Sequence, residues 1–382
     1  AGGLVQSEGT RGVAMLLVDN DWFEARGSQD LVLLLCAHPS VVSAAQAFSA
    51  KGALAAPLLG KDRKCVHVLQ REVATVDFKA DDAILASDDA TTCTIVAVVS
   101  KSTGMASIAH FDEATSLSDL CLHKLLRGAI PEGCSEAEGD ADLYLVGGMA
   151  EDTGVGLRTA GNLLRHLQAS SLRFHVRLAC VHALNTLPCG GPVHKGLALD
   201  PLTGWCTSAD AATGPVARRG PLLDERLAHF WVVSQEATDL MEIHDARERE
   251  LVVMDRPPFA VTPALAVYCA YLLTLEDGDL LSRTSTTPAH EGPGFIGDVR
   301  RAAARVIALH DRRHVGELPL ARRFRWEGAM GDWQEVGDMG GKGKGIPAQG
   351  VGNIPSSKST DSLQLGTMSR VSSLSIMDGL GQ

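Results

Sequence analysis

The chain has 382 residues, of which 45% are hydrophobic and 21% charged, a composition typical of globular proteins. Its formal net charge of -11 argues against a general nucleic-acid-binding surface or a surface for anionic membranes. No apolar run approaches the roughly 20 residues that a bilayer-spanning helix needs. The first residues also lack the basic and then apolar pattern of a secretory signal.

The cysteines carry information about compartment and metals. There are nine, an odd number without framework spacing, which favours reduced thiols in a cytoplasmic or nuclear compartment. No Cys-x-x-Cys or His-Glu-x-x-His motif occurs. Cys121 and His123 are the nearest approach to a metal pair, but they would not share a helix face. We therefore expect no metal site.

The predicted elements alternate between strands and helices along the chain. Residues 1–29 are Gly-rich and poorly patterned, and Ser40 is a candidate helix cap. The pattern then predicts a helix over 40–50, strands over 66–70 and 72–76, and a hairpin over 94–99 and 105–110. A helix over 116–127, a strand over 142–148, a helix over 155–168 and a strand over 174–182 should follow. The rest of the chain is expected to form a hairpin over 195–199 and 204–207, strands over 229–234, 251–254 and 265–274, a basic helix over 296–310 and a hairpin over 322–326 and 332–336.

These elements define the predicted domain organisation. Residues 337–382 are Gly/Ser-rich and contain no aromatic residue, which predicts a disordered tail. Residues 30–336 are expected to form a single α+β domain with helices packed on antiparallel sheets. In the helix over 116–127 we expect Leu117, Leu120 and Leu125 on the apolar side.

The segment 87–93, Ser-Asp-Asp-Ala-Thr-Thr-Cys, is the most informative stretch. It has turn chemistry, and Cys93 leads directly into the first strand of the hairpin, whose second strand closes at His110. Because the strands of a hairpin are antiparallel, these two ends should lie side by side. A thiol next to an imidazole is the minimum equipment of a cysteine nucleophile with a base.

Simpler interpretations compete with this one. Cys93 can equally be a buried strand cysteine, the commoner fate of a thiol. The glycines Gly154, Gly156 and Gly161 superficially match a dinucleotide fingerprint, but the third is misplaced, and helix entry after a strand explains them better. The residues alone leave the choice for Cys93 open.

The segment 87–93 resembles the active-site segment of the protein N-terminal asparagine amidohydrolase family. Shorter stretches also resemble that family, so the likeness extends from about residue 30 to 336: they are 30–32, 37–39, 69–73, 109–112, 145–148, 184–185 and 196–198. The spacing of thiol and histidine is also similar to that in bacterial chemoreceptor-glutamine deamidases and cytotoxic necrotizing factor toxins. The resemblance implies an α-β-β sandwich like that of these cysteine–histidine deamidases.

The resemblance also implies an activity. Members of the family hydrolyse the side-chain amide of an N-terminal asparagine to aspartate and ammonia, and the product feeds arginyl transfer and ubiquitin-dependent degradation. The resemblance assigns the role of nucleophile to Cys93, that of base to His110 and that of a supporting hydroxyl to Ser87. The expected partners are proteins or peptides with N-terminal Asn, and no cofactor is needed.

A carboxylate should bind the free α-ammonium group that distinguishes an N-terminal from an internal Asn. Asp88 and Asp89 are the first candidates, because they lie in the same turn as Cys93, and Glu72 is the next. Turn capping is the competing role for both aspartates. Two other functions stay open: a glutamine-directed deamidase or transglutaminase, and a non-catalytic module that binds N-terminal Asn.

Overall fold

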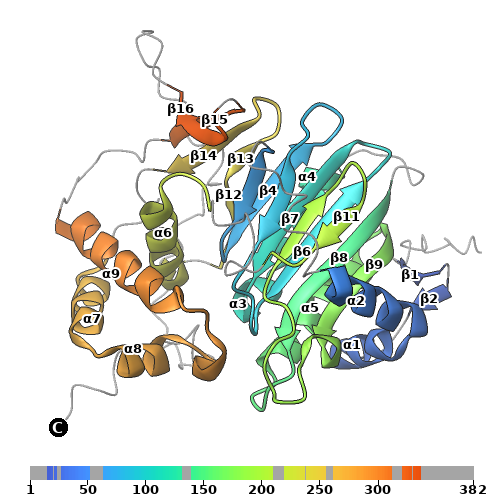
Figure 1. Cartoon of the computed structure of the whole chain (residues 1–382), viewed down its shortest axis with the longest axis horizontal. Coiled ribbons are helices and arrows are strands. Elements are labelled where there is room, and N and C mark those ends of the chain that lie inside the picture. Colours follow the sequence, from blue (N-terminus) through green and yellow to red (C-terminus); the bar gives the residue numbers. More distant parts are fainter. Residues whose placement is uncertain are drawn as a thin grey trace, which may run out of the picture.

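The computed structural model describes residues 15–19, 21–23, 27–51, 63–130, 139–209, 219–236, 238–254, 261–311, 321–328 and 330–336. The predicted tail over 337–382 and most of the segment 1–29 lie outside these residues. The described part combines several sheets with helices, as expected for an α+β fold (Figure 1).

A central eight-stranded sheet organises the molecule. Its strands lie in the order β12 (Met241–Glu242), β4 (Glu72–Asp77), β7 (Met105–Phe111), β6 (Thr94–Ser100), β8 (Asp140–Met149), β9 (Arg173–His182), β1 (Met15–Val18) and β2 (Asp21–Phe23). The predicted hairpin is confirmed: β6 and β7 pair antiparallel, with Ile95 opposite His110. The neighbouring strands β4 and β8 pair antiparallel with the outer sides of this hairpin.

The expectation of purely antiparallel sheets is wrong, because the central sheet is mixed. Strands β8 and β9 are parallel, as are β9 and β1 and also β4 and β12. The helix α5 (Val155–Ala169) connects β8 to β9, and a helical crossover returns the chain to the same end of the sheet.

A second sheet packs on one face of the central sheet. Its order is β11 (Trp205–Thr207), β10 (Leu197–Asp200), β5 (Ile84–Ser87) and β3 (Cys65–Val68), in which only β3 and β5 are parallel. Ile95, Ala97 and Val99 point into the core between the two sheets. Val96 and Val98, which alternate with them along β6, face the helices on the other side.

Helices cover that other face. They are α1 (Ser28–Ala37), α3 (Glu113–Ser116), α4 (Asp119–Ala129) and α5, and the short 3-10 turn η1 (Ala183–Asn185) follows β9. The helix α2 (Pro39–Lys51) lies instead on the side of the second sheet, where its Ala45 and Phe48 join the core between the two sheets. Figure 1 shows α4 and α5 behind the central sheet and β11 in front of it. The order helices, sheet, sheet gives three layers, with a core on each side of β6.

The helix predicted over 116–127 begins later in the structure, at Asp119. Ser118 caps α4 by accepting a hydrogen bond from the N–H of Cys121, so Leu117 precedes the helix. Leu117 and Leu120 are each 55% exposed, whereas the buried face consists of Cys121, Leu122, Leu125, Leu126 and Ala129. Leu125 is thus buried as expected. Leu120 is not, because five positions along an α-helix separate the two side chains by about 140° around the axis.

The C-terminal part forms a separate group of helices beside the β12 edge. It contains α6 (Leu223–Glu236), α7 (Pro263–Thr274), α8 (Asp277–Thr284), the short turn η3 (Pro288–His290) and α9 (Phe295–Asp311), and Figure 1 shows α6 to α9 gathered on one side of the sheets. The predicted strands over 229–234 and 265–274 are therefore wrong. Both are apolar runs that periodicity cannot assign, and Thr262 capping with Pro263 at the first helical position identifies α7.

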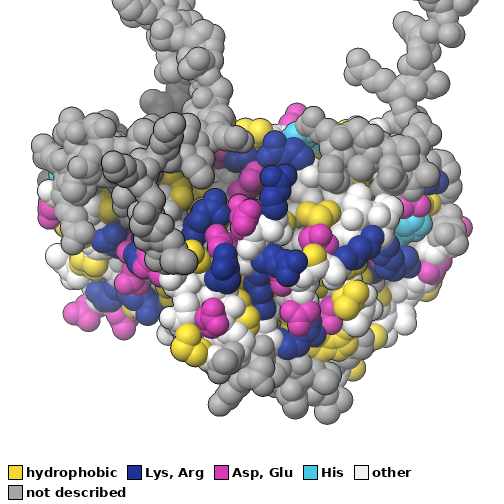
Figure 2. Space-filling view, turned by 90° about the horizontal axis from the view of Figure 1, so that it is seen from above, with side chains coloured by type: hydrophobic (Ala, Val, Ile, Leu, Met, Phe, Trp, Pro, Cys, Tyr) yellow, Lys and Arg dark blue, Asp and Glu magenta, His cyan; other side chains and the backbone are white. Residues whose placement is uncertain are grey.

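A third, antiparallel sheet completes the described fold. Its strands are β13 (His244–Asp245), β14 (Glu250–Met254), β15 (Ala321–Glu327) and β16 (Asp332–Glu335), which confirms the last predicted hairpin. Ion pairs between its strands join Arg322 to Glu335 and Arg325 to Glu250. On the face seen in Figure 2, basic and acidic side chains are likewise interspersed.

Among the described residues, no single helix is both long and apolar enough to cross a membrane. The pair Ser28–Ala37 and Pro39–Ala50 passes that test only when both are taken together, and the two are bent by 72°. Leu31, Val32 and Leu35 of α1 are fully buried in the core between the helices and the central sheet.

Candidate active site

Cys93 lies at the end of the turn that joins β5 to β6. Asp89 has a left-handed backbone, with φ of 59°, which turns the chain sharply before the cysteine. The Cys93 carbonyl accepts a hydrogen bond of 2.7 Å from the N–H of Gly148. A Cβ at Gly147, where φ is +117°, would lie 2.3 Å from that carbonyl oxygen. The two glycines therefore let β8 run close enough to hold the cysteine backbone.

His110 faces the core between the two sheets, from the end of β7. It is opposite Ile95, and Cys93, two positions before Ile95, projects to the same face of the sheet. The imidazole is 2% exposed, and its Nδ1 lies 2.9 Å from the Oγ of the fully buried Ser87. Within the described residues, Nε2 of His110 has no hydrogen-bond partner. The tautomer with hydrogen on Nδ1 donates to Ser87 and leaves Nε2 as a basic acceptor.

The surroundings keep both groups neutral. Burial raises the pKa of the Cys93 thiol well above its ordinary value, and the carboxylates of Asp112 and Glu291 raise it further against the opposing charge of Arg71. Burial also lowers the pKa of His110 to about 4, although Asp88 and Asp112 oppose the shift. The resting site thus holds a thiol and a neutral imidazole at pH 7 and not a thiolate–imidazolium pair.

Asp112 follows β7 directly and lies near the Cys93 end of the hairpin. Its Oδ2 accepts a hydrogen bond of 2.7 Å from Nε of Arg71, and its Oδ1 caps α3 through the N–H of Thr115. Burial alone would raise the pKa of Asp112, but the charge of Arg71 and these hydrogen bonds hold it below the usual range. Asp112 is therefore an ionised side chain that is held in place at the wall of the cavity.

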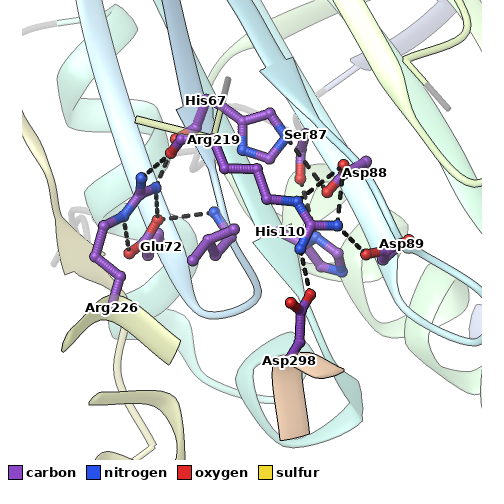
Figure 3. Close-up of polar contacts among 10 residues, drawn as sticks. His67, Glu72, Ser87, Asp88, Asp89, His110, Arg219, Arg226 and Asp298 are labelled. Atoms are coloured by element: carbon purple, nitrogen blue, oxygen red, sulfur yellow. Dashed lines mark hydrogen bonds and ion pairs between the residues drawn. The ribbon is translucent and has the colours of Figure 1, made fainter. Parts of the chain in front are cut away.

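Asp88 and Asp89 both pair with one arginine. Nη2 of Arg219 lies 3.2 Å from Oδ2 of Asp88 and is also bonded to Asp89, while Nη1 bonds to Asp298 of α9. Figure 3 shows the guanidinium held among the three carboxylates. Asp88 also lies 3.3 Å from Nε2 of His67. Arg219 thus occupies the two aspartates that the sequence offered for the substrate amine.

The pKa values of the two aspartates move in opposite directions. Burial would raise the pKa of Asp88, but the charges and hydrogen bonds of His67 and Arg219 hold it below the usual value. Burial and the neighbouring charge of Asp88 raise the pKa of Asp89, against the opposing charge of Arg219.

Glu72 is brought close to this network but does not line the cavity. Its carboxylate is fully buried and forms a two-pronged pair with Arg226 of α6, seen in Figure 3. It also accepts a hydrogen bond of 2.7 Å from the N–H of Leu69. Arg226 in turn donates to the carbonyl of His67, at 2.6 Å. The contacts of Glu72 therefore join α6 to the edge of the central sheet.

A cavity of about 770 Å³ opens between the sheets and the C-terminal helices. Cys93, His110, Asp88 and Asp89 line it, while Ser87 lies behind His110. The helical side contributes an apolar group, which consists of Leu227, Phe230, Trp231, Phe295 and Val299. The cavity thus places a thiol and a neutral imidazole beside a mixed polar and apolar wall.

Several residues of the site were not predicted. Arg219 and Glu291 come from segments far from Cys93 in sequence and carried no motif. Arg71 and Asp112 stand within stretches that resemble the family, so the resemblance was the only available signal for them. The eight described cysteines are all free, and no described cluster of His, Cys, Asp and Glu could hold a metal ion.

Comparison with known proteins identifies the family. The sequence model for "Protein N-terminal asparagine amidohydrolase" matches residues 59–335. The chain belongs to this family. Its relatives include the protein N-terminal asparagine amidohydrolase of Mus musculus, 27% identical over 290 residues that cover 75% of this chain and 86% of the mouse protein.

A plant relative and a human relative carry the same family name. The Arabidopsis thaliana protein is 25% identical over 266 residues, which cover 63% of this chain and 72% of the relative. The Homo sapiens protein is 27% identical over 240 residues, which cover 62% and 72%. The family resemblance inferred from segment 87–93 is therefore confirmed, while the roles of individual residues remain to be proposed.

Proposed function

We propose that this protein hydrolyses the side-chain amide of N-terminal asparagine by cysteine nucleophilic catalysis. One observation carries the proposal beyond family membership. Cys93 and His110 line one cavity, and Ser87 is bonded to Nδ1 of the imidazole so that Nε2 stays available to the thiol. A nucleophile, a base and a group that orients the base are the recurring parts of such sites.

The reaction begins from the neutral pair. As the sulfur of Cys93 attacks the amide carbon, its proton passes to Nε2 of His110 and a C–S bond forms. His110 then returns the proton to the departing nitrogen, the C–N bond breaks, and ammonia leaves a thioester. Water attacks the thioester while His110 accepts its proton, and the C–S bond breaks to give aspartate and the thiol.

The turn can stabilise the oxyanion that forms at each attack. No described residue accepts a hydrogen bond from the backbone N–H of Thr92 or Cys93. Such N–H groups, fixed next to the nucleophile, are the usual donors to a developing oxyanion. The carbonyl of Cys93 is already bonded to Gly148, which keeps this stretch of backbone rigid.

The wider role follows from family resemblance. We infer that the product, an N-terminal aspartate, enters arginyl transfer and ubiquitin-dependent degradation in the cytoplasm, and that the fold is related to the α-β-β cysteine–histidine deamidases. The helix–sheet–sheet layering around β6 supports that kinship.

Peptides that differ only in their first residue test the proposal. We expect the protein to release ammonia from an Asn-initiated peptide and to prefer Asn over Gln by about 10- to 200-fold, since one extra methylene shifts the amide in a fitted pocket. Cys93→Ala is the inactive control. Equal turnover of Gln would favour the glutamine-directed alternative, and binding without ammonia release would indicate a non-catalytic module.

A further inference from the structure

Six carboxylates line the active-site cavity, and five of them are ion-paired. Asp88, Asp89 and Asp298 pair with Arg219, Asp112 pairs with Arg71, and Glu113 pairs with Arg158. The sixth is Glu291, which forms no ion pair within the described residues and accepts a hydrogen bond from Oγ of Ser285. Among the described residues, Glu291 is therefore the lining carboxylate that no cation holds in an ion pair, although the charge of Lys195 acts on it.

The segment that carries Glu291 is hydrogen-bonded to the turn over 87–93, which ends at Cys93 and is called the nucleophile turn below. Oγ1 of Thr287 donates to Oγ1 of Thr91 at 3.0 Å, and the hydroxyls of Thr286 and Thr92 lie 3.2 Å apart. Thr91 and Thr92 immediately precede Cys93. These bonds hold Glu291 and the thiol on the wall of the same cavity.

Charge also connects Glu291 to the nucleophile. Burial raises the pKa of Glu291, with Ser285 and Lys195 opposing and Asp89 adding to the shift. In turn, after burial and Asp112, Glu291 is the next group that raises the pKa of Cys93. A cation bound at Glu291 would cancel part of the charge that disfavours the thiolate.

We propose that Glu291 binds the α-ammonium group of the N-terminal Asn, and that this pairing promotes loss of the Cys93 proton only when a free N-terminus is present. The inference rests on the proposed amidohydrolase function. In asparagine only two carbons separate the ammonium nitrogen from the amide carbon, a distance of roughly 3–4 Å. The anchor must therefore share the cavity wall with Cys93. Glu291 meets that condition without displacing Arg219 from Asp88 and Asp89.

The proposal predicts opposite effects of one substitution. Glu291→Gln keeps the shape and can still accept a hydrogen bond from Ser285, but it removes the charge. Substrate selection should then weaken, while the Cys93 thiol of the free enzyme should become more acidic. A purely structural role would not increase thiol reactivity.

The experiment compares an Asn-initiated peptide with the same peptide lacking the α-amine, in which a 3-carbamoylpropanoyl group replaces Asn. The wild type should prefer the amine by about 10- to 100-fold in kcat/KM, the range of one charge-assisted hydrogen bond. Glu291→Gln should reduce that preference to about threefold or less. Glu276→Gln, an exposed glutamate at the start of α8, should retain the full preference.

Alkylation by iodoacetamide measures the thiol without turnover. At pH 7 the Cys93 adduct, quantified by mass, should form about threefold or more faster in Glu291→Gln than in the wild type, because the thiolate fraction rises. Glu291→Asp, which keeps the charge, should alkylate like the wild type. Melting curves verify that the variants are folded.

Each failure has its own signature. If the wild type releases no ammonia from the Asn peptide, the proposed function fails. If the wild type is active but Glu291→Gln keeps the full amine preference, Glu291 is not the anchor. If its alkylation rate is unchanged or lower, the coupling between amine binding and the nucleophile is overturned.

Discussion

At the scale of single residues, burial decides the protonation of the proposed catalytic pair, Cys93 and His110. An exposed histidine is half-protonated near pH 6.5, but desolvation lowers the pKa of His110 to about 4. The same burial keeps Cys93 a thiol. A neutral imidazole can accept the thiol proton at once, so the resting site is poised for general-base attack without a preformed ion pair.

The pH dependence of kcat/KM should reflect this neutral pair. Activity should be flat from about pH 6 to 7 and should fall as the pH drops through about 4, because protonated His110 cannot accept the thiol proton. Steady-state rates measured at each pH provide the profile. Full recovery of activity on return to pH 7 is the control for folding. The same acid limb should remain in Glu291→Gln. A limb near pH 6.5 would show that His110 is not desolvated in the free enzyme.

Loss of either member of the pair should be severe and non-additive. Cys93→Ala should reduce kcat on the order of a thousandfold or more, and His110→Ala should be nearly as damaging. The double variant should be no worse than Cys93→Ala, since the imidazole acts only on the thiol and on the thioester that the thiol forms. Ammonia release under single-turnover conditions measures this. Additive losses would assign the two residues to separate steps.

Ser87 should act through His110. Ser87→Ala removes the hydrogen bond to Nδ1, so we expect kcat to fall about 10- to 100-fold with little change in KM. Ser107→Ala is the matched control. Ser107, on β7, is also buried, and its hydroxyl bonds to that of Thr75 on the neighbouring β4, outside the lining of the cavity. A Ser87→Ala enzyme with wild-type kcat would remove Ser87 from the proposed mechanism.

At the scale of elements, the approach of β8 to the nucleophile turn sets the position of Cys93. The register places Gly147 opposite Thr94, and the hydrogen bonds from Gly148 and Met149 reach the carbonyls of Cys93 and Thr91. The turn is therefore fixed by the neighbouring strand as much as by its own sequence.

Gly147→Ala should damage both stability and activity. The positive φ and the 2.3 Å approach to the Cys93 carbonyl together predict a loss of about 2–5 kcal/mol in unfolding free energy, with a fall in kcat in the folded fraction. Denaturant titration and turnover measure the two effects. Gly278→Ala in α8, where a Cβ meets nothing within 4 Å, should be neutral or slightly stabilising. Equal stability of the two variants would contradict the close approach.

At the scale of the whole molecule, the sheets and the C-terminal helices are joined through buried charges. Arg226 links α6 to Glu72 on β4, and Arg219 links Asp298 on α9 to the nucleophile turn. Lys64 pairs with Asp81 at 2.6 Å, and Nδ1 of His244 lies 2.6 Å from the carbonyl oxygen of Thr75, beside the third sheet. Buried groups of this kind make the stability of the whole fold depend on pH.

The melting temperature should fall as the pH is lowered from about 6.5 to about 4. Burial lowers the pKa of both His110 and His244 to about 4 in the folded protein, below the ordinary 6.5. The unfolded chain therefore binds protons first, and the stability present above pH 6.5 is lost across this window, by roughly a few kcal/mol in total. His244→Gln should show a shallower pH dependence in calorimetry. An unchanged slope would mean that His244 does not titrate on unfolding.

The sequence by itself determined the local parts of this protein. The segment 87–93, the two strands that follow it and the closing His110 are neighbours along the chain, so hairpin geometry alone brings Cys93 and His110 together. The local sequence pattern also sufficed to predict the last hairpin and the helix α5. These features depend on contacts over short sequence separations, where propensity and pattern are informative.

Only the tertiary structure decided the rest. Arg219 reaches Asp88 across 131 positions, and Thr287 reaches Thr91 across 196, separations at which no local pattern specifies a partner. The same holds for the helical state of α6 and α7, apolar segments whose assignment depends on what they pack against. The protonation of Cys93 and His110 is also a tertiary property, because it follows from the removal of water by two sheets and the charges that remain around them.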